Sequence, residues 1–415
     1  MQRAEVILSL LGRKSKENPS FVFQRLYRNF FNPDFYLFAQ KKLHIQVSAD
    51  TIQSTLQKLR NEQYYPQFLS REQSRISDID RLVQEILYLL LRAIYEPLFL
   101  RTTGGVNGDV AVIPFLHKIE SLASGAHWVF RGKIRHFFSQ MSPSLLLHQL
   151  SNKIQDGRLL ELIRRFLQAG YIQPPFGSKD QKLAFLLAHI YLQPLDVWMD
   201  HFADAYASQG KMKYIRHVDD LLIFVQGPKS MAVECQQKLM AFLDQQYRLE
   251  LDPEQSQVIS LREQLLLFMG YHITRAKNGR LLYLVPQPVL QEKLRPFMKN
   301  GRPTHYSARI HLPVPKIISL YHQEISSLYN YYCFAHDVNK KLGKFRYYHF
   351  RSLLKTIASK EKCSMQKVID KYGFTHSKMQ RTTIGTTYLT ADGQEKWMVY
   401  FPYPIRRCHH PIKME

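Results

Sequence analysis

The stretch Tyr214-Ile-Arg-His-Val-Asp-Asp-Leu-Leu-Ile-Phe224 decides the fold, because it reads as two apolar strands joined by a tight turn. The expected strands are Met212–Ile215 and Leu221–Val225, and the turn carries Asp219 and Asp220. Two adjacent like charges are costly to bury unless a cation compensates them. Nucleotidyl-transfer sites hold carboxylates in such hairpins, where Mg²⁺ stabilises the attacking and leaving oxygens. The pattern therefore predicts a divalent-metal site, with an Asp-Asp turn that only caps a hairpin as the alternative.

Charge and composition favour a nucleic-acid partner. The 415-residue chain carries 57 Lys+Arg against 34 Asp+Glu, a net charge of +23, together with 24 Tyr and 25 Phe. Such a surplus attracts phosphates, and aromatic rings stack on bases. The alternatives are a basic protein on an anionic membrane surface and one whose charge merely keeps copies apart. No run approaches the roughly 18 apolar residues of a membrane span.

The cysteines and the N-terminus bear on the compartment. Four scattered cysteines, including Cys408 in the run Cys408-His409-His410, lack the C-x-x-C spacing of zinc modules. That run is either a fragment of a metal site or a solvated tail. The N-terminus reads as an amphipathic helix and not as a signal or transit peptide. We expect a protein of the bacterial cytoplasm, or one encoded within a mitochondrion or chloroplast.

The chain changes character along its length. The sequence predicts an apolar helix over Arg75–Leu100, opened by Ser77 and Asp78. Proline, glycine and basic residues interrupt the periodic pattern near Arg295–Pro315, and a basic helical region is expected over Lys316–Tyr372. Residues 295–371 hold 15 Lys+Arg against four Asp+Glu, a surplus of 11 in 77 residues.

Four groups of motifs follow one another through nearly the whole chain. They are Leu26–Leu37, Asp80–Gln84 with Tyr95–Phe99, Asp156–Ile163 with Ala169–Tyr171 and Leu187–Asp196, and finally Tyr329–Tyr332 with Ser352–Lys360 and Val368–Gly373. Their order and spacing resemble those of the group II intron reverse transcriptase/maturase family. Members of that family bind their host intron RNA and help it to splice, and many also copy RNA into DNA.

The resemblance implies an α+β fold with the right-hand architecture of reverse transcriptases. An N-terminal helical segment and fingers would occupy residues 1–120, and a palm with the His217–Asp220 hairpin would occupy 121–290. A helical thumb/maturase domain X would follow over 291–375, and a β-like tail over 376–415. We expect no C-terminal endonuclease.

The expected palm departs from the family where a further metal-binding aspartate belongs. The family pattern is similar to Asp-Ile-Lys-x-Phe-Phe, whereas this chain has Lys133-Ile-Arg-His-Phe-Phe138. At an effective dielectric constant near 20, an ammonium a few ångströms from a cation repels it by roughly 4 kcal/mol per pair of unit charges. No Asp or Glu lies between Glu120 and Asp156, so a shifted alignment restores nothing. We expect Asp219 and Asp220 to be relics of a catalytic pair, with Lys133 neutralising one of them. The alternative is that Asp219 still binds Mg²⁺.

Three further departures affect the polymerisation machinery. The family's Pro-Gln-Gly-Gly turn corresponds to Ser178-Lys-Asp-Gln181, the template loop is reduced to Gly105-Val-Asn-Gly-Asp109, and segment 48–75 is short for a fingers region. Together with the lost aspartate, they predict little or no polymerase activity. The alternative is an active RNA-directed DNA polymerase serving intron mobility, with a third carboxylate from Asp156 or Asp196.

The basic helical region carries the features expected of an RNA-binding surface. The candidate contact residues are Tyr331, Tyr332, Arg346, Arg351, Lys355 and Lys360. Arg351 and Lys355 would share a helix face with Lys360 close by, which suits the phosphates and unpaired bases of structured RNA. Core packing of the tyrosines and a merely solvated basic face are the alternatives.

The leading interpretation is a maturase that binds group II intron RNA, alone, as a homodimer or in a ribonucleoprotein. A repurposed, reverse-transcriptase-like scaffold subunit of another ribonucleoprotein is a further alternative.

Overall fold

A computed structural model of the chain describes residues 2–67, 76–100, 103–104, 112–171, 182–208, 210–376, 381–389 and 393–411. Among the predicted departures, Gly105–Asp109, Ser178–Gln181 and the end of segment 48–75 lie outside these ranges. The chain forms two compact units. The first comprises Met1–Ala111 and Lys118–Ile259, and the second comprises Val112–His117 and Ser260–Glu415. The four-part division expected from the sequence remains a prediction.

Helices make up most of the first unit. Their bounds are α1 (Ala4–Glu17), α2 (Pro33–Leu43), α3 (Ala49–Arg60), α4 (Asp78–Tyr95), α5 (Val112–Leu122, which begins in the second unit), α6 (Phe137–Gln140), α7 (Pro143–Ser151), α8 (Gly157–Gln168), α9 (Lys182–Tyr191), α10 (Gln193–Ala205) and α11 (Lys229–Tyr247). The helix predicted within Arg75–Leu100 is confirmed as α4. The Ser77 hydroxyl caps it by accepting a hydrogen bond from the Asp80 amide. Apolar side chains all around α4 are buried, because it packs against α1, α2 and α9.

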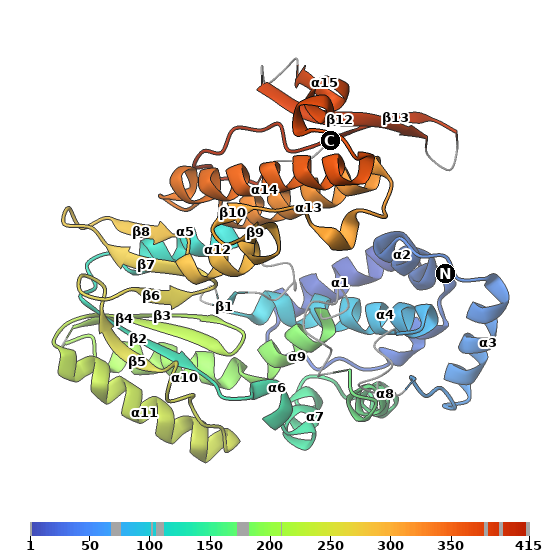
Figure 1. Cartoon of the computed structure of the whole chain (residues 1–415). Coiled ribbons are helices and arrows are strands. Elements are labelled where there is room, and N and C mark those ends of the chain that lie inside the picture. The colour runs from blue at the N-terminus through green and yellow to red at the C-terminus, as the bar shows by residue number, and fades with distance from the viewer. Residues whose placement is uncertain are drawn as a thin grey trace. The chain divides into compact units, whose positions relative to one another are not determined.

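A five-stranded sheet stands beside these helices. Its strands are β1 (Thr103–Gly104), β2 (Trp128–Lys133), β3 (Lys211–His217), β4 (Asp220–Gln226) and β5 (Gln257–Ser260), in the order β1-β3-β4-β2-β5. Both strands predicted around the Asp-Asp turn are confirmed, and they pair antiparallel as the β3–β4 hairpin. Helices α10 and α11 pack on one face of this sheet, as Figure 1 shows. Strand β4 is apolar and almost wholly buried, so the hairpin rests on a firm core.

The second unit is built around two long helices. Its elements are β6 (Leu266–Phe268), β7 (Tyr271–Arg275), β8 (Leu281–Leu284), α12 (Gln287–Leu294), β9 (Met298–Lys299), β10 (Arg302–Pro303), α13 (Val314–Tyr332), α14 (Val338–Glu361), α15 (Met365–Tyr372), β11 (Gly373–His376), β12 (Arg381–Leu389) and β13 (Glu395–Val399). Helices α13 and α14 lie side by side (Figure 1). With α15 they confirm the helical region predicted over Lys316–Tyr372.

The helices, together with sheets whose strands pair mainly antiparallel, confirm the expected α+β class. None of the helices in the described ranges combines the length and the apolar character that crossing a membrane requires.

Candidate functional site

The β3–β4 hairpin turns through only two residues, Val218 and Asp219, between the paired residues His217 and Asp220. Val218 has a φ of 56°, in the left-handed region that a β-branched residue rarely adopts. The turn is held in place because the Val218 side chain is buried and its carbonyl accepts a 2.8 Å hydrogen bond from Arg216 Nη1. A strained residue supported in this way is a common property of functional sites.

Arg216 anchors the hairpin from the face covered by α10. Its Nε lies 2.8 Å from Asp196 Oδ1 on that helix, and both side chains are almost completely buried. The Tyr214 hydroxyl donates to the same carboxylate at 2.8 Å. Since successive residues of a strand point to opposite faces, His217 and its neighbour Asp220 face away from α10.

On that other face, two cations from β2 meet the two carboxylates of the hairpin. Lys133 Nζ lies 2.8 Å from Asp219 Oδ1. Arg131 donates two hydrogen bonds to Asp220, Nε to Oδ1 at 3.1 Å and Nη2 to Oδ2 at 2.9 Å. The ion pair expected for Lys133 is therefore present. Arg131 was not predicted from the sequence, although its spacing two residues before Lys133 places both on one face of β2.

The backbone of Lys133 is fixed as firmly as its side chain. Its amide donates to Ser256 Oγ at 3.0 Å, and its carbonyl accepts from the Asp252 amide at 2.7 Å. The next amide, that of Ile134, donates to the Asp219 carbonyl at 2.8 Å. The cation is thus built into the strand that faces the turn, and not carried by a mobile segment.

Burial and charge shape the protonation of the site. Burial raises the pKa of Asp220, while the hydrogen bonds from Arg131 oppose that rise. Burial also lowers the pKa of His217 to about 4, so this imidazole is neutral at pH 7. Within the described ranges, no three His, Cys, Asp or Glu side chains form a group that could hold a metal ion.

The two carboxylates considered for a rebuilt polymerase site have other partners. Asp156 caps α8, where its Oδ2 accepts from the Tyr27 amide at 2.8 Å and its Oδ1 accepts from the Leu159 amide at 3.3 Å. Asp196 is neutralised by Arg216 on the opposite face of the sheet. Neither is positioned here as a third ligand beside Asp219 and Asp220.

The two candidate tyrosines of α13 differ in exposure. The Tyr332 ring is buried, at 4% exposure, and its hydroxyl donates to the Gly270 carbonyl at 3.0 Å. Tyr331 remains 38% exposed while its hydroxyl donates to the Met269 carbonyl at 2.8 Å. Both therefore brace the turn between β6 and β7, and Tyr331 alone of the pair presents a ring to solvent.

The candidate cations of α14 make contacts with neutral groups. Arg351 is exposed, with its guanidinium 5.6 Å from the centre of the Tyr347 ring. The other three donate to backbone carbonyls: Lys355 to Pro303 at 2.7 Å, Lys360 to Ile310 at 3.2 Å and Arg346 to Tyr403 at 3.2 Å. A carbonyl positions an ammonium or guanidinium without cancelling its charge. The contacts of Lys355 and Lys360 fix these two ammonium groups and keep their field available to an anion.

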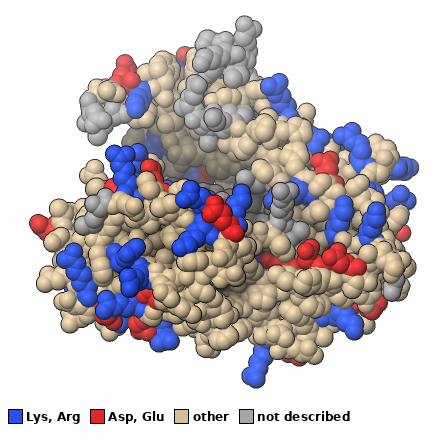
Figure 2. Space-filling view, turned by 180° about the vertical axis from the view of Figure 1, so that it is seen from behind, with Lys and Arg blue, Asp and Glu red and all other residues tan. Residues whose placement is uncertain are grey.

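The positive charge of the chain is concentrated in the second unit. That unit holds 26 Lys+Arg against nine Asp+Glu, so it carries a surplus of 17 out of the net charge of +23. Figure 2 shows Lys and Arg side chains spread over one face of the molecule, with acidic side chains among them. A distributed positive surface suits an extended polyanion better than a small anionic ligand.

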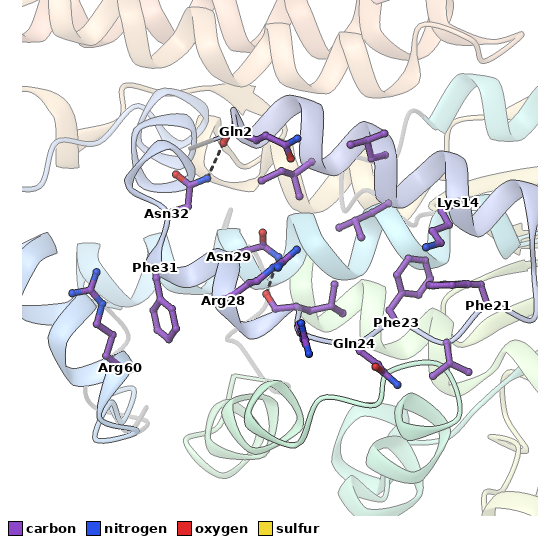
Figure 3. Close-up of a pocket in the computed structure, with 16 residues that line it drawn as sticks. Gln2, Lys14, Phe21, Phe23, Gln24, Arg28, Asn29, Phe31, Asn32 and Arg60 are labelled. Carbon is purple, nitrogen blue, oxygen red and sulfur yellow. Dashed lines mark hydrogen bonds between the residues drawn. The ribbon is translucent and has the colours of Figure 1, made fainter.

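A pocket of about 690 Å³ in the first unit forms another basic and aromatic surface (Figure 3). Lys14 lies with Phe21 and Phe23 at one end, and Arg60 lies near Phe31 at the other. Lys14 Nζ stands 3.7 Å from the centre of the Phe21 ring. The lining also includes Arg25 and Arg28, and none of its residues is acidic. This group was not predicted from the sequence, because α1, the 21–32 segment and α3 come together only in the fold.

Comparisons of sequence with known proteins agree on one family. A sequence model described as type II intron maturase matches residues 279–406. The group II intron-encoded protein LtrA of Lactococcus lactis subsp. cremoris is 26% identical over 487 residues, covering 90% of this chain and 80% of LtrA. Nuclear intron maturase 2, mitochondrial, of Arabidopsis thaliana is 22% identical over 255 residues, covering 42% of this chain and 35% of that protein. Among solved structures, telomerase from Candida albicans aligns with a TM-score of 0.42 at 13% identity, over 79% of this chain and 54% of the telomerase chain.

Proposed function

Because the chain belongs to the group II intron reverse transcriptase/maturase family, we propose that it binds group II intron RNA and assists its folding and splicing without acting as a polymerase. The ion pair between Lys133 and Asp219 is the observation that supports the absence of polymerase activity. In this proposal Lys133 stands where the family has a metal-binding aspartate. Its ammonium group neutralises the carboxylate that a metal ion would otherwise neutralise.

The residues around the hairpin do not fit Mg²⁺. Magnesium takes carboxylate oxygens at close range in a nearly octahedral shell. Asp219 is occupied by the Lys133 ammonium, and both oxygens of Asp220 are occupied by Arg131. A divalent ion at Asp219 would have to displace one cation and approach the other. We therefore assign Asp219 and Asp220 a structural role, as relics of a catalytic pair that now bind β2 to the hairpin.

The RNA-binding part of the proposal rests on the charge and rigidity of the second unit. Arg346, Arg351, Lys355 and Lys360 lie on one long helix, and three of them are oriented by neutral carbonyls. Contacts between such cations and RNA phosphates supply most of the affinity for a structured RNA. The pocket around Lys14 and Arg28 offers a further positive surface in the first unit. The relatives come from bacteria and mitochondria, and we propose one of these settings for this chain, as a homodimer or in a ribonucleoprotein assembly.

Crosslinking the protein to RNA in its own cell, followed by sequencing of the bound RNA, tests this function. We expect reads concentrated on the structured arms of one or a few introns. Reads concentrated on a stable RNA that is not an intron would refute the maturase function and favour the scaffold alternative. Primer extension by the purified protein in Mg²⁺, lost in Asp219→Ala, would refute the absence of polymerase activity.

A further inference from the structure

The sheet formed by β11, β12 and β13 exposes large apolar side chains. Trp397 on the edge strand β13 is 64% exposed, and Leu389 on β12 is 73% exposed. The Trp397 ring lies 5.4 Å, centre to centre, from the ring of Phe374 on β11. Single exposed apolar residues are ordinary, but adjacent aromatic rings on an open sheet are typical of a binding surface.

Strand register places the two aromatic residues on one face. Phe374 pairs with Thr383, and Trp397 pairs with Thr387, four residues further along β12. Directly paired residues share a face, as do residues separated by an even number along a strand. Phe374 and Trp397 therefore flank β12 from its two sides and meet above it.

Gly385 makes that meeting possible. It lies between Thr383 and Thr387 on the same face, and a Cβ atom there would stand 2.6 Å from Cε1 of Phe374. Any side chain at this position would displace the Phe374 ring, and its Cβ atom would also stand 2.9 Å from the Met398 carbonyl oxygen. Because Gly385 has no side chain, the Phe374 ring can lie close to β12. The Trp397 side chain beside it remains 64% exposed.

The sheet that carries the rings is firmly anchored from behind. Strands β12 and β13 both pack against α13, and His322 Nδ1 of that helix lies 2.8 Å from the Val399 carbonyl. The Tyr400 amide donates to the Ile384 carbonyl at 2.9 Å. A platform whose backbone is fixed loses little entropy when a ligand covers it.

We propose that Trp397 and Phe374 form a stacking platform for an unpaired base of RNA, an inference that rests on the proposed RNA-binding function. Every nucleobase has a face that can stack on an indole, and stacking contributes about 1–3 kcal/mol per base. The charge of the surrounding unit favours this occupant. A second copy of the chain would bring another surplus of 17 positive charges against the first, whereas an RNA strand neutralises it.

Tryptophan fluorescence can report on the platform directly. The chain has three tryptophans, so the double variant Trp128→Phe/Trp198→Phe leaves Trp397 as its single emitter. The probe is a labelled single-stranded oligonucleotide, whose binding is followed independently by fluorescence anisotropy of the label. We expect binding to quench Trp397 emission, because a stacked base quenches indole fluorescence. Circular dichroism melting checks that the double variant is folded.

Substitutions in the otherwise unchanged chain give the second readout. Trp397→Ala should weaken binding of the single strand about 5–150-fold, the equivalent of one stacked base. Trp397→Tyr should restore most of it, and fully paired RNA should bind all three proteins equally. Tyr65→Ala is the matched control, because Tyr65 is as exposed, at 69%, but belongs to the first unit.

The possible outcomes distinguish failure of the stacking platform from failure of the proposed RNA-binding function. Anisotropy that reports binding while Trp397 emission stays unchanged overturns the platform and leaves the proposed function intact. Failure to bind any RNA overturns both. Trp397 emission that depends on protein concentration without RNA, together with a dimer in sedimentation, assigns the surface to a second copy and also overturns the platform.

Discussion

The Lys133 ammonium lies 2.8 Å from the Asp219 carboxylate, and the strand that carries it also delivers Arg131 to Asp220. Two carboxylates and two cations therefore form a balanced set on one face of the sheet. The arrangement removes the electrostatic reason for a metal ion to enter. It also turns a pair of like charges, which would repel each other, into a link between β2 and the β3–β4 hairpin.

Breaking the pair should destabilise the protein measurably. Lys133 and Asp219 are partly buried, with side chains 28% and 19% exposed, so their coupling should fall between that of surface and buried pairs. We expect Lys133→Ala to lower the free energy of unfolding by about 1–2 kcal/mol in urea denaturation. A double-mutant cycle with Asp219→Ala should recover most of that as coupling energy. Arg13→Ala, which removes an exposed pair with Glu17, is the control and should cost less than about 0.5 kcal/mol. Additive single variants would contradict the role assigned to the pair.

Removing the cations should create an affinity for divalent metal that, on our proposal, the unchanged chain does not have. Lys133→Asp combined with Arg131→Ala leaves three carboxylates near the turn and no neutralising partner. We expect millimolar Mg²⁺ to raise the melting temperature of this variant, because a ligand that binds the folded state stabilises it. The unchanged protein should melt at the same temperature with Mg²⁺ or with NaCl of equal ionic strength. A Mg²⁺-specific rise in the unchanged protein that Asp219→Ala abolishes would show that a metal site persists.

Substitutions of the neighbouring tyrosines of α13 should distinguish a role in packing from a role in RNA contact. Tyr332 is buried with its hydroxyl bonded, so Tyr332→Ala should cost about 3–5 kcal/mol of stability, as buried aromatic truncations do. Tyr331 is more exposed, and Tyr331→Ala should cost about 1 kcal/mol. Thermal melts compare the two variants, and RNA affinity is measured well below both melting temperatures. We expect Tyr331→Ala alone to weaken RNA binding in its folded state. Equal stability losses would contradict the difference in burial.

The basic face of α14 should show itself in the salt dependence of RNA binding. Arg351→Gln removes an exposed cation, and its phosphate contact should lower the slope of log affinity against log salt by about one unit. Lys355→Gln and Lys360→Gln should act similarly, and they should also loosen the segments that their ammonium groups hold. Asp219→Ala should leave RNA affinity unchanged, which makes it the control. An unaltered slope in Arg351→Gln would exclude that residue from the interface.

Local pattern and family resemblance explain how far the sequence could predict this site. The hairpin and α4 were predictable because strand alternation, an N-cap and helical spacing depend only on residues that are close together in the sequence. The family resemblance predicted that Lys133 pairs with one of the two aspartates, and the structure shows that this aspartate is Asp219. Arg131 was not predicted because the family pattern marks only the position of Lys133; its spacing two residues before Lys133 was the available signal, and the register of β2 against β4 brings it to Asp220. The burial of Tyr332 depends in the same way on a distant turn, at Gly270.

The neutral His217 beside the hairpin should make stability fall in acid. Burial lowers its pKa from 6.5 to about 4 in the folded protein, while the unfolded chain keeps the ordinary value. The folded state therefore binds fewer protons between these values, and stability that is fully present above about pH 6.5 is lost as the pH falls toward 4. We expect up to about 1.4 kcal/mol per pH unit in this window. Comparing urea denaturation of the unchanged protein and His217→Asn at pH 7 and pH 4.5 isolates the effect, because the other acidic groups titrate in both. If the two proteins lose stability equally, His217 is not buried as a neutral group.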